Sequence, residues 1–290
     1  MKYKFKTEPY EHQLEALKRS WNKQEYAYFM EMGTGKSKVL VDNISVLYDR
    51  GAINAAVIVA PKGVYKNWSE REIPTHMPEH IIRRIGVWNP APNKKQKLQL
   101  TNLFEVTDDL KILIINVEAF STKKGVAFVE KFLLTHNVLM AVDESTTIKN
   151  PKAQRTKNLV KLSLQSKYKR ILTGFPVTQS PLDLYSQTEF LNAGMLGYSS
   201  FYTFQNQYAK VINRNMGQRT FRQVVGYQNI EELSDKVNQF SYRVLKKDCL
   251  DLPDKVYQKR EVELTPEQKK VYNQIKDYAI AELESSEIVS

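Results

Sequence analysis

The sequence predicts an α/β domain built on a parallel β-sheet, and three observations support this prediction. Short, nearly continuous apolar runs recur along the first two thirds of the chain, which is typical of strands covered on both faces. Amphipathic stretches with a helical period separate these runs, and such alternation favours a parallel sheet with crossover helices. Hydrophobic residues make up 42% of the 290 residues, enough for a sizeable core.

The elements follow one another in a regular order up to about residue 190. An amphipathic helix is predicted over residues 10–21, because Tyr10, Leu14, Leu17 and Trp21 fall on one face. Five buried strands are predicted after it, over residues 26–30, 55–60, 111–116, 138–143 and 168–173.

The pattern changes after residue 192. Residues 193–250 are rich in Tyr, Phe, Gln and Asn, and we expect a mainly helical inserted subdomain there. It includes a predicted β-hairpin around Asn215-Met216-Gly217 and a helix over 229–240. Residues 251–290 are predicted to be a bridging segment. Its helix is expected to begin after Thr265, with Gln268 completing a capping box.

Composition limits the classes of function. The net charge of +11 suggests a polyanionic partner such as nucleic acid, although a merely lysine-rich soluble protein is the alternative. The single Cys249 excludes an internal disulfide and a cysteine zinc cluster. No run approaches the roughly 18 apolar residues of a membrane span, and no leader pattern appears at the N-terminus. We therefore expect no membrane association and an intracellular location, in a bacterial or virus-infected cytoplasm or a nucleus.

The stretch "EMGTGKSK" at residues 31–38 predicts a phosphate-binding loop between a strand and a helix. Gly33 and Gly35 allow the backbone N–H groups of Gly33, Thr34 and Gly35 to surround phosphates, Lys36 supplies a positive charge, and the Ser37 hydroxyl can bind Mg²⁺. The general pattern has Gly where this chain has Met30. A glycine-rich turn before a helix is the alternative interpretation.

Two adjacent carboxylates, Asp143 and Glu144, follow the predicted strand over residues 138–143. In P-loop ATPases a strand-end Asp holds Mg²⁺, and a neighbouring Glu can orient the attacking water. Taken alone, such a pair is more often the solvated start of a loop. Together with the upstream phosphate loop, it predicts a site for ATP and Mg²⁺, with Ser37 and Asp143 as metal ligands and Lys36, Asp143 and Glu144 as catalytic residues.

Six motifs in order resemble the first RecA-like motor lobe of the Swi/Snf-type helicase-like ATPases, in helicase superfamily two. They are "PYEHQLEAL", "EMGTGKS", "VIVAPKGVYKNWSEREI", "DESTTIKNPKAQRTK", "ILTGFPVTQSPLDLYSQTEFLN" and "YRVLKKDCLDLPDKVYQKREVELTPEQKKVY". The resemblance implies a RecA-like P-loop domain over residues 1–192, with Gln13 and Tyr10 on the adenine side. It also implies translocation along double-stranded DNA, with RNA as a possible substrate.

Two lysine-bearing loops are predicted to contact nucleic acid. Lys62 and Lys66 follow one buried strand, and Lys149, Asn150 and Lys152 follow the carboxylate pair. Both loops are expected to leave the same edge of a parallel sheet, where ligands bind, and such phosphate contacts are independent of base sequence. A second basic patch is expected at Arg243, Lys246 and Lys247. Each lysine alone is more often a solvated surface charge.

The chain departs from the family pattern in three ways. Ser145 and Thr146 stand where the family has Ala and His, and Phe175 replaces the second Thr of the Thr-Gly-Thr-Pro motif. No second RecA-like lobe, which carries arginine fingers, is recognisable, so we expect a partner lobe in cis or in trans and slow hydrolysis by these residues alone. A non-hydrolysing nucleic-acid-binding or scaffolding module, or a lobe of a restriction or repair helicase, is the alternative.

Overall fold

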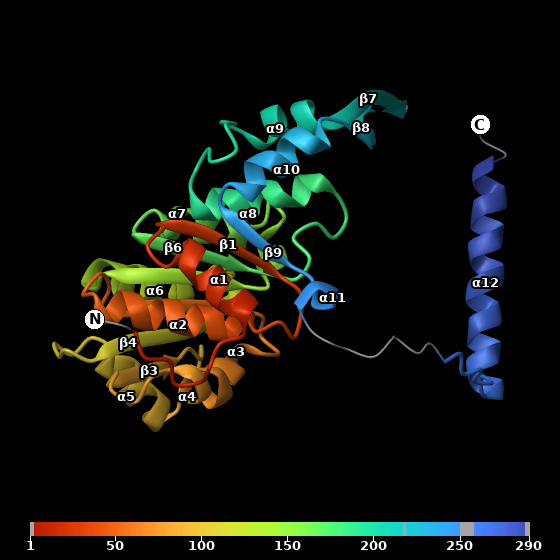
Figure 1. Cartoon of the computed structure of the whole chain (residues 1–290). Helices are drawn as coiled ribbons and strands as arrows, with labels where there is room; N and C mark the ends of the chain where they lie inside the picture. The colour runs from red at the N-terminus through yellow and green to blue at the C-terminus, as the bar shows by residue number, and fades with distance from the viewer. Residues whose placement is uncertain (1–2, 217–218, 250–257, 288–290) are drawn as a thin grey trace. The chain divides into compact units, whose positions relative to one another are not determined.

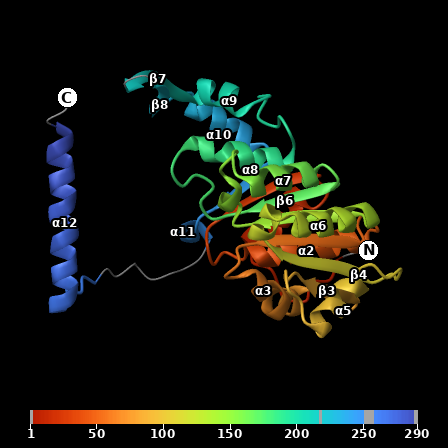
Figure 2. The same ribbon diagram turned by 180° about the vertical axis from the view of Figure 1, so that it is seen from behind.

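The computed structural model of the chain describes residues 3–216, 219–249 and 258–287. The chain separates into two compact units, Met1–Asp251 and Leu252–Ser290. The first unit contains a seven-stranded sheet with helices on both faces (Figures 1 and 2). The strand order is β3-β4-β2-β5-β6-β1-β9, and each neighbouring pair is parallel. Its strands are β1 (Glu25–Met30), β2 (Ala55–Ala60), β3 (Arg83–Val87), β4 (Leu110–Asn116), β5 (Val138–Asp143), β6 (Tyr168–Leu172) and β9 (Ser241–Val244).

The five predicted strands are all present, with bounds that agree to within one residue. The sequence did not predict β3 and β9, which are the two edge strands of the sheet. Both are short, and each is flanked by a neighbouring strand on one side only. Their sequences, "RRIGV" and "SYRV", therefore lack the continuous apolar run by which a central strand is recognised.

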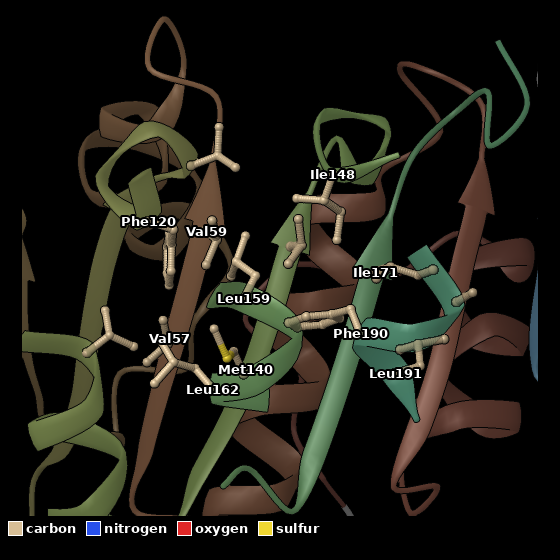
Figure 3. Close-up of a cluster of buried hydrophobic side chains, with 14 of the residues drawn as sticks. Val57, Val59, Phe120, Met140, Ile148, Leu159, Leu162, Ile171, Phe190 and Leu191 are labelled. Atoms are coloured by element: carbon tan, nitrogen blue, oxygen red, sulfur yellow. The ribbon is translucent and has the colours of Figure 1, made fainter. Parts of the chain in front are cut away.

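The hydrophobic core lies in two layers, one on each face of the sheet. Val57 and Val59 of β2 point to one layer, whereas Ala56 and Ile58 point to the other, as the alternation of side chains along a strand requires. Figure 3 shows part of the first layer, in which residues from β2, β5 and β6 pack against Phe190 and its neighbours. Burial on both faces explains why these central strands are apolar throughout.

The helices divide between the two layers. One face is covered by α1 (Glu11–Ser20), α2 (Lys36–Asp49), α3 (Tyr65–Asn67), the π-helical turn η1 (Trp68–Glu72) and α4 (Ile73–His76). The other face is covered by α5 (Lys94–Asn102), α6 (Lys123–Thr135), α7 (Gln154–Ser163) and α8 (Leu184–Leu191), with the 3₁₀ turn η2 (Val117–Ser121). Side chains of α9 (Phe201–Tyr208) and α10 (Ile230–Asn238) continue the same hydrophobic cluster beyond α8 (Figure 1). Two further 3₁₀ turns are present: η3 (Ser145–Ile148) follows β5, and η4 (Pro181–Asp183) precedes α8.

The stretch predicted as a subdomain contains α9, the antiparallel strands β7 (Ala209–Met216) and β8 (Arg219–Tyr227), and α10. The tip of the predicted hairpin, at residues 217–218, lies outside the described residues. The chain then returns to the main sheet, where β9 pairs with β1 (Figure 1), and continues into α11 (Lys246–Cys249). Within the part of the chain that the structure describes, no helix is long and apolar enough to cross a bilayer.

The second unit contains one long helix, α12 (Pro266–Glu287). The Thr265 hydroxyl accepts from the Gln268 backbone N–H at 3.3 Å, and the Gln268 side chain accepts from the Thr265 N–H at 3.1 Å. This reciprocal pair is a capping box, and it confirms the predicted start of the helix.

Candidate nucleotide-binding site

Three loops that carry motif residues meet at the carboxyl edge of the sheet. The loop at residues 31–35 follows β1, Asp143-Glu144 ends β5, and Thr173 follows β6. Because β6 lies between β5 and β1 in the sheet, all three loops emerge side by side. A Cβ added to Gly174 would lie 3.2 Å from the Met32 backbone nitrogen, so the loop after β6 packs directly on the loop after β1.

The loop at residues 31–35 has the backbone shape of a phosphate cradle. Gly33 and Gly35 have φ values of +83° and +86°, which side chains other than hydrogen rarely allow. Helix α2 begins at Lys36, and among the described residues no side chain caps its first turn. The free N–H groups and the helix dipole favour an anion there. The Lys36 side chain is buried beside this position, and Ser37 is half-buried.

Gln13 supports the same loop from α1. Its side-chain oxygen accepts from the Tyr10 N–H at 3.1 Å, and its Nε2 donates to the Thr34 carbonyl at 3.1 Å. His12 Nε2 donates to the same carbonyl at 2.8 Å. Gln13 is buried, and a Cβ on Gly35 would lie 2.2 Å from its Nε2. The residue predicted on the adenine side therefore also fixes the phosphate loop.

Tyr10 lies on the rim of a cavity beside α1. The ring is 65% exposed and stacks on His12 with a centroid distance of 5.8 Å. The cavity has a volume of about 840 Å³ and lies between α1 and the β9–α11 segment, with Arg19 and Lys247 also in its lining. An exposed aromatic face beside a polar cavity suits a planar base, and the role of Tyr10 stays a prediction.

Asp143 is held in place at the end of β5. Its Oδ2 accepts from the Trp68 indole N–H at 3.1 Å, and its Oδ1 accepts from the Glu144 backbone N–H at 3.0 Å. Burial raises the pKa of the carboxyl to about 6, and the neighbouring Glu144 carboxylate adds to this rise. Lys36 and the Trp68 hydrogen bond oppose it.

Glu144 has an unusual backbone conformation. Its φ of +48° and ψ of +61° are left-handed, which costs a non-glycine residue free energy and occurs most often at functional sites. The Thr173 hydroxyl donates to its Oε2 at 3.3 Å, and the Phe175 N–H donates to that hydroxyl at 3.2 Å. Thr173 thus contacts the Glu144 carboxylate directly.

These oxygen groups fit a magnesium ion. Mg²⁺ prefers one or two carboxylates together with phosphate oxygens and water, and here one carboxylate and the Ser37 hydroxyl flank the phosphate cradle. Burial is the main cause of the raised pKa of Asp143, and the neighbouring Glu144 carboxylate adds to it, so a bound cation would stabilise the charged carboxylate. Within the described ranges, no group of three or more His, Cys, Asp or Glu residues is placed to hold a metal ion.

The predicted nucleic-acid loops leave neighbouring strands. β2 and β5 pair directly, with Val59 opposite Val142, so the loops after them emerge at the same edge, as expected. Lys62, Lys66 and Lys152 are exposed, as is Asn150, whose side chain accepts from the Lys152 N–H at 2.9 Å. Lys149 differs, because its ammonium donates to the Thr178 hydroxyl at 2.7 Å and lies 3.5 Å from Asp183 Oδ2.

Two residues make contacts at the site that the sequence did not predict. Trp68 belongs to a quoted motif, but only the structure reveals its bond to Asp143, 75 residues away. Lys246 was assigned to a second basic patch with Arg243 and Lys247, which are exposed. Instead, its N–H donates to Glu31 Oε2 at 2.9 Å, and a Cβ on Gly33 would lie 3.3 Å from its Cε. Lys246 therefore lies against the phosphate loop.

Comparison with known proteins agrees with this geometry. The sequence matches the family described as SNF2-related domain over residues 12–290. The chain belongs to this family. The predicted resemblance to Swi/Snf-type proteins is thereby confirmed at the level of the SNF2 family.

Relatives in the SNF2 family are much longer than this chain. The TATA-binding protein-associated factor MOT1 of Saccharomyces cerevisiae is 28% identical over 240 residues, which cover 80% of this chain and 12% of MOT1. The chromatin-remodeling ATPase INO80 of Candida albicans is 28% identical over 267 residues, which cover 88% of this chain and 18% of that protein. The chain thus spans less than a fifth of the length of either relative.

A solved SNF2 structure has the same fold. The SWI2/SNF2 ATPase core of Sulfolobus solfataricus, in complex with dsDNA, aligns with a TM-score of 0.64 and 24% sequence identity. The alignment covers 98% of this chain and 55% of that chain. It confirms the predicted RecA-like architecture, with a parallel sheet between two layers of helices.

Proposed function

We propose that this chain is the ATP-binding, N-terminal motor lobe of a Swi/Snf-type translocase that acts on double-stranded DNA. The observation that carries the proposal is the meeting of the phosphate loop, Asp143-Glu144 and Thr173 at one edge of the sheet. Membership of the SNF2 family supports it. We place such a protein inside the cell, where ATP and DNA are found.

Each residue has a distinct role in the proposed site. The N–H groups from Gly33 to Ser37 and the Lys36 ammonium bind the phosphates. Ser37 and Asp143 hold Mg²⁺, which when bound supplies the positive charge that stabilises the transferring phosphoryl group. Glu144 accepts a proton from the attacking water, and Thr173 orients that carboxylate through their 3.3 Å hydrogen bond. Gln13, with Tyr10, lies on the adenine side.

Nucleic acid is proposed to bind beside the nucleotide, on the loops after β2 and β5. The solved SNF2 relative is a complex with dsDNA, and the exposed Lys62, Lys66 and Lys152 lie on loops from this edge. Lys149 and Asn150 complete this surface. Contacts of this kind read phosphates and tolerate any base sequence, which suits a motor that moves along DNA.

Hydrolysis by these 290 residues alone is proposed to be slow. Phosphoryl transfer in related enzymes depends on an arginine that reaches the γ-phosphate. Arg170 cannot supply it, because the side chain is fully buried and donates to backbone carbonyls and to Asn43. A second RecA-like lobe, in cis or in trans, is the proposed source.

Calorimetry with Mg²⁺ and a non-hydrolysable ATP analogue tests the nucleotide site. Lys36→Ala removes a charge-assisted phosphate contact, so we expect affinity to fall by about 1.5–3 kcal/mol, or roughly tenfold to a hundredfold. Lys161→Ala, which removes an exposed lysine from the last turn of α7, is the matched control and should bind as the wild type does. Equal affinities in Lys36→Ala and the control would rule out this assignment.

A further inference from the structure

A buried hydrogen bond lies directly behind Glu144. Ser145 Oγ donates to Gln187 Oε1 at 2.6 Å, and both residues are 0% exposed. Gln187 Nε2 donates to the carbonyls of Pro176 and Asp183, each at 2.8 Å. The oxygen and both N–H groups of this amide are therefore used. A fully satisfied network of this kind fixes the geometry of the segments that it joins.

The amide of Gln187 connects both structures that control Glu144. Ser145 follows Glu144 directly and so fixes the backbone on which that carboxylate is carried. Pro176 ends the Thr-Gly-Phe-Pro motif, whose Thr173 donates to the carboxylate itself. A shift of helix α8, which carries Gln187, would move the carboxylate and its hydrogen-bond donor together.

The same helix is tied to the loop proposed to bind DNA. Asp183 Oδ2 accepts from the Thr178 N–H at 3.0 Å, the Thr178 hydroxyl at 2.8 Å and the Gln179 N–H at 2.9 Å. Lys149 donates to that Thr178 hydroxyl and lies 3.5 Å from the Asp183 carboxylate. A phosphate at Lys149 would compete with both groups for the ammonium, and would thereby loosen the start of α8.

We propose that Ser145 and Gln187 form a positioning pair that makes DNA binding at Lys149 and Mg-nucleotide binding beside Glu144 depend on one another. This inference rests on the proposed function, because it takes DNA and ATP as the two ligands. The resemblance places Ala at the position of Ser145, and an apolar pair would fill this space without desolvating two polar groups. The hydrogen bond between Ser145 and Gln187 instead holds the two side chains at a fixed distance and orientation.

The test measures how strongly each ligand changes the affinity for the other. A short fluorescent DNA duplex is titrated with the 290-residue chain, with and without saturating Mg²⁺ and a non-hydrolysable ATP analogue, and the ratio of the two dissociation constants is the coupling factor. We expect a factor of about five or more in the wild type. In Ser145→Ala and in Gln187→Leu we expect a factor within about twofold of one, with DNA affinity in the absence of nucleotide retained.

Two further variants keep the result interpretable. Ser145→Ala/Gln187→Leu removes both partners together, so no buried polar group of the pair is left unsatisfied, and it should also lose the coupling. Ser163→Ala removes another fully buried serine, whose hydroxyl donates to the Val160 carbonyl of its own helix. It should keep the coupling factor of the wild type.

The possible outcomes separate this inference from the proposed function. A wild-type chain that binds neither ligand overturns the proposed function itself. A wild-type chain that binds both ligands with a coupling factor of one overturns the positioning pair alone. The pair is equally overturned if the double variant keeps the wild-type factor, whereas loss of coupling in that variant and not in Ser163→Ala supports it.

Discussion

The two halves of the carboxyl edge are built differently. In the half with the proposed nucleotide site, Asp143 is held by Trp68, Glu144 by Thr173, and the phosphate loop by Gln13. In the half with the proposed nucleic-acid surface, Lys62 and Lys66 extend into solvent. Groups that stabilise a transition state work best when they are already oriented. Contacts to the phosphates of a moving duplex need only a positively charged side chain that is long enough to reach a phosphate. The difference indicates that rigidity is concentrated where chemistry is proposed to occur.

The largest expected effect concerns the rate of ATP hydrolysis. The measurement tests whether the ordered residues of the proposed nucleotide site are enough for hydrolysis without an arginine from a second lobe. An arginine finger contributes roughly 10³–10⁵ in rate, or about 4–7 kcal/mol. We therefore expect steady-state hydrolysis by the 290-residue chain to lie at least about 10³-fold below a typical enzyme rate of about 10 s⁻¹. Saturating duplex DNA should not restore it, because DNA supplies no such arginine.

Glu144→Gln sets the background rate for that measurement. A wild-type rate near 10 s⁻¹ that this substitution abolishes would contradict the expectation. The arginine would then come from within the chain or from a second copy of it. Arg243 and Arg260, both exposed, would be the first to replace.

The next largest effect concerns Arg170, which lies in β6, the strand directly before Thr173. Its guanidinium donates to Asn43 Oδ1 and to the carbonyls of Ser20, Lys23, Gln24 and Lys169, at 2.8–2.9 Å. Arg170→Met removes all five of these hydrogen bonds from a fully buried position, so we expect a loss of about 3–5 kcal/mol in the free energy of unfolding. Chemical denaturation monitored by circular dichroism measures it.

Lys169→Met is the matched control for Arg170. Lys169 is also buried, but its ammonium lies 3.5 Å from an oxygen of Glu25, whose side chain is 20% exposed and so remains partly hydrated, and the loss should therefore be smaller than for Arg170→Met. Equal losses in the two variants would show that the carbonyl cluster around Arg170 adds nothing specific to the fold.

The smallest effect concerns the exposed half. Replacing Lys62, Lys66 or Lys152 with Ala should lower the slope of log affinity against log salt by about 1 for each lysine that binds a phosphate. Lys161→Ala is the control, since Lys161 lies in the last turn of α7, a full helix after the loop that carries Lys152. DNA titrations over a range of salt concentrations measure the slope. A slope that is unchanged when all three are replaced together would place the DNA surface elsewhere.

The central part of the fold could be predicted because its signal is local. β2 and β5 are apolar along their whole length, and both were predicted with their observed bounds. β3 and β9 could not be recognised, because an edge strand is covered by only one neighbour and tolerates arginine and serine. Whether such a segment pairs at all depends on the strand beside it, and in β9 that strand lies more than 200 positions earlier in the chain.

The site shows the same division. The phosphate loop and the Asp143-Glu144 pair are short motifs, so their positions were predicted from the sequence. The contacts that hold them were not, because Trp68 and Thr173 are 75 and 29 positions away from their partners. Lys149 was predicted as a phosphate contact like its neighbours, but the sequence gives no sign that Thr178 and Asp183 already engage it.

The pairing of β9 with β1 has a consequence for how this chain is made. Within this sheet β1 comes first along the chain and β9 comes last, so the edge of β1 that β9 covers stays open until residues 241–244 have been synthesised. Contacts between such distant segments form slowly, and an apolar strand such as "EYAYFM" with one open edge is prone to associate with other chains. A nascent chain that stops before residue 241 would leave β1 as an open edge of the sheet. Its yield in soluble form should therefore depend on chaperones far more than that of the full chain.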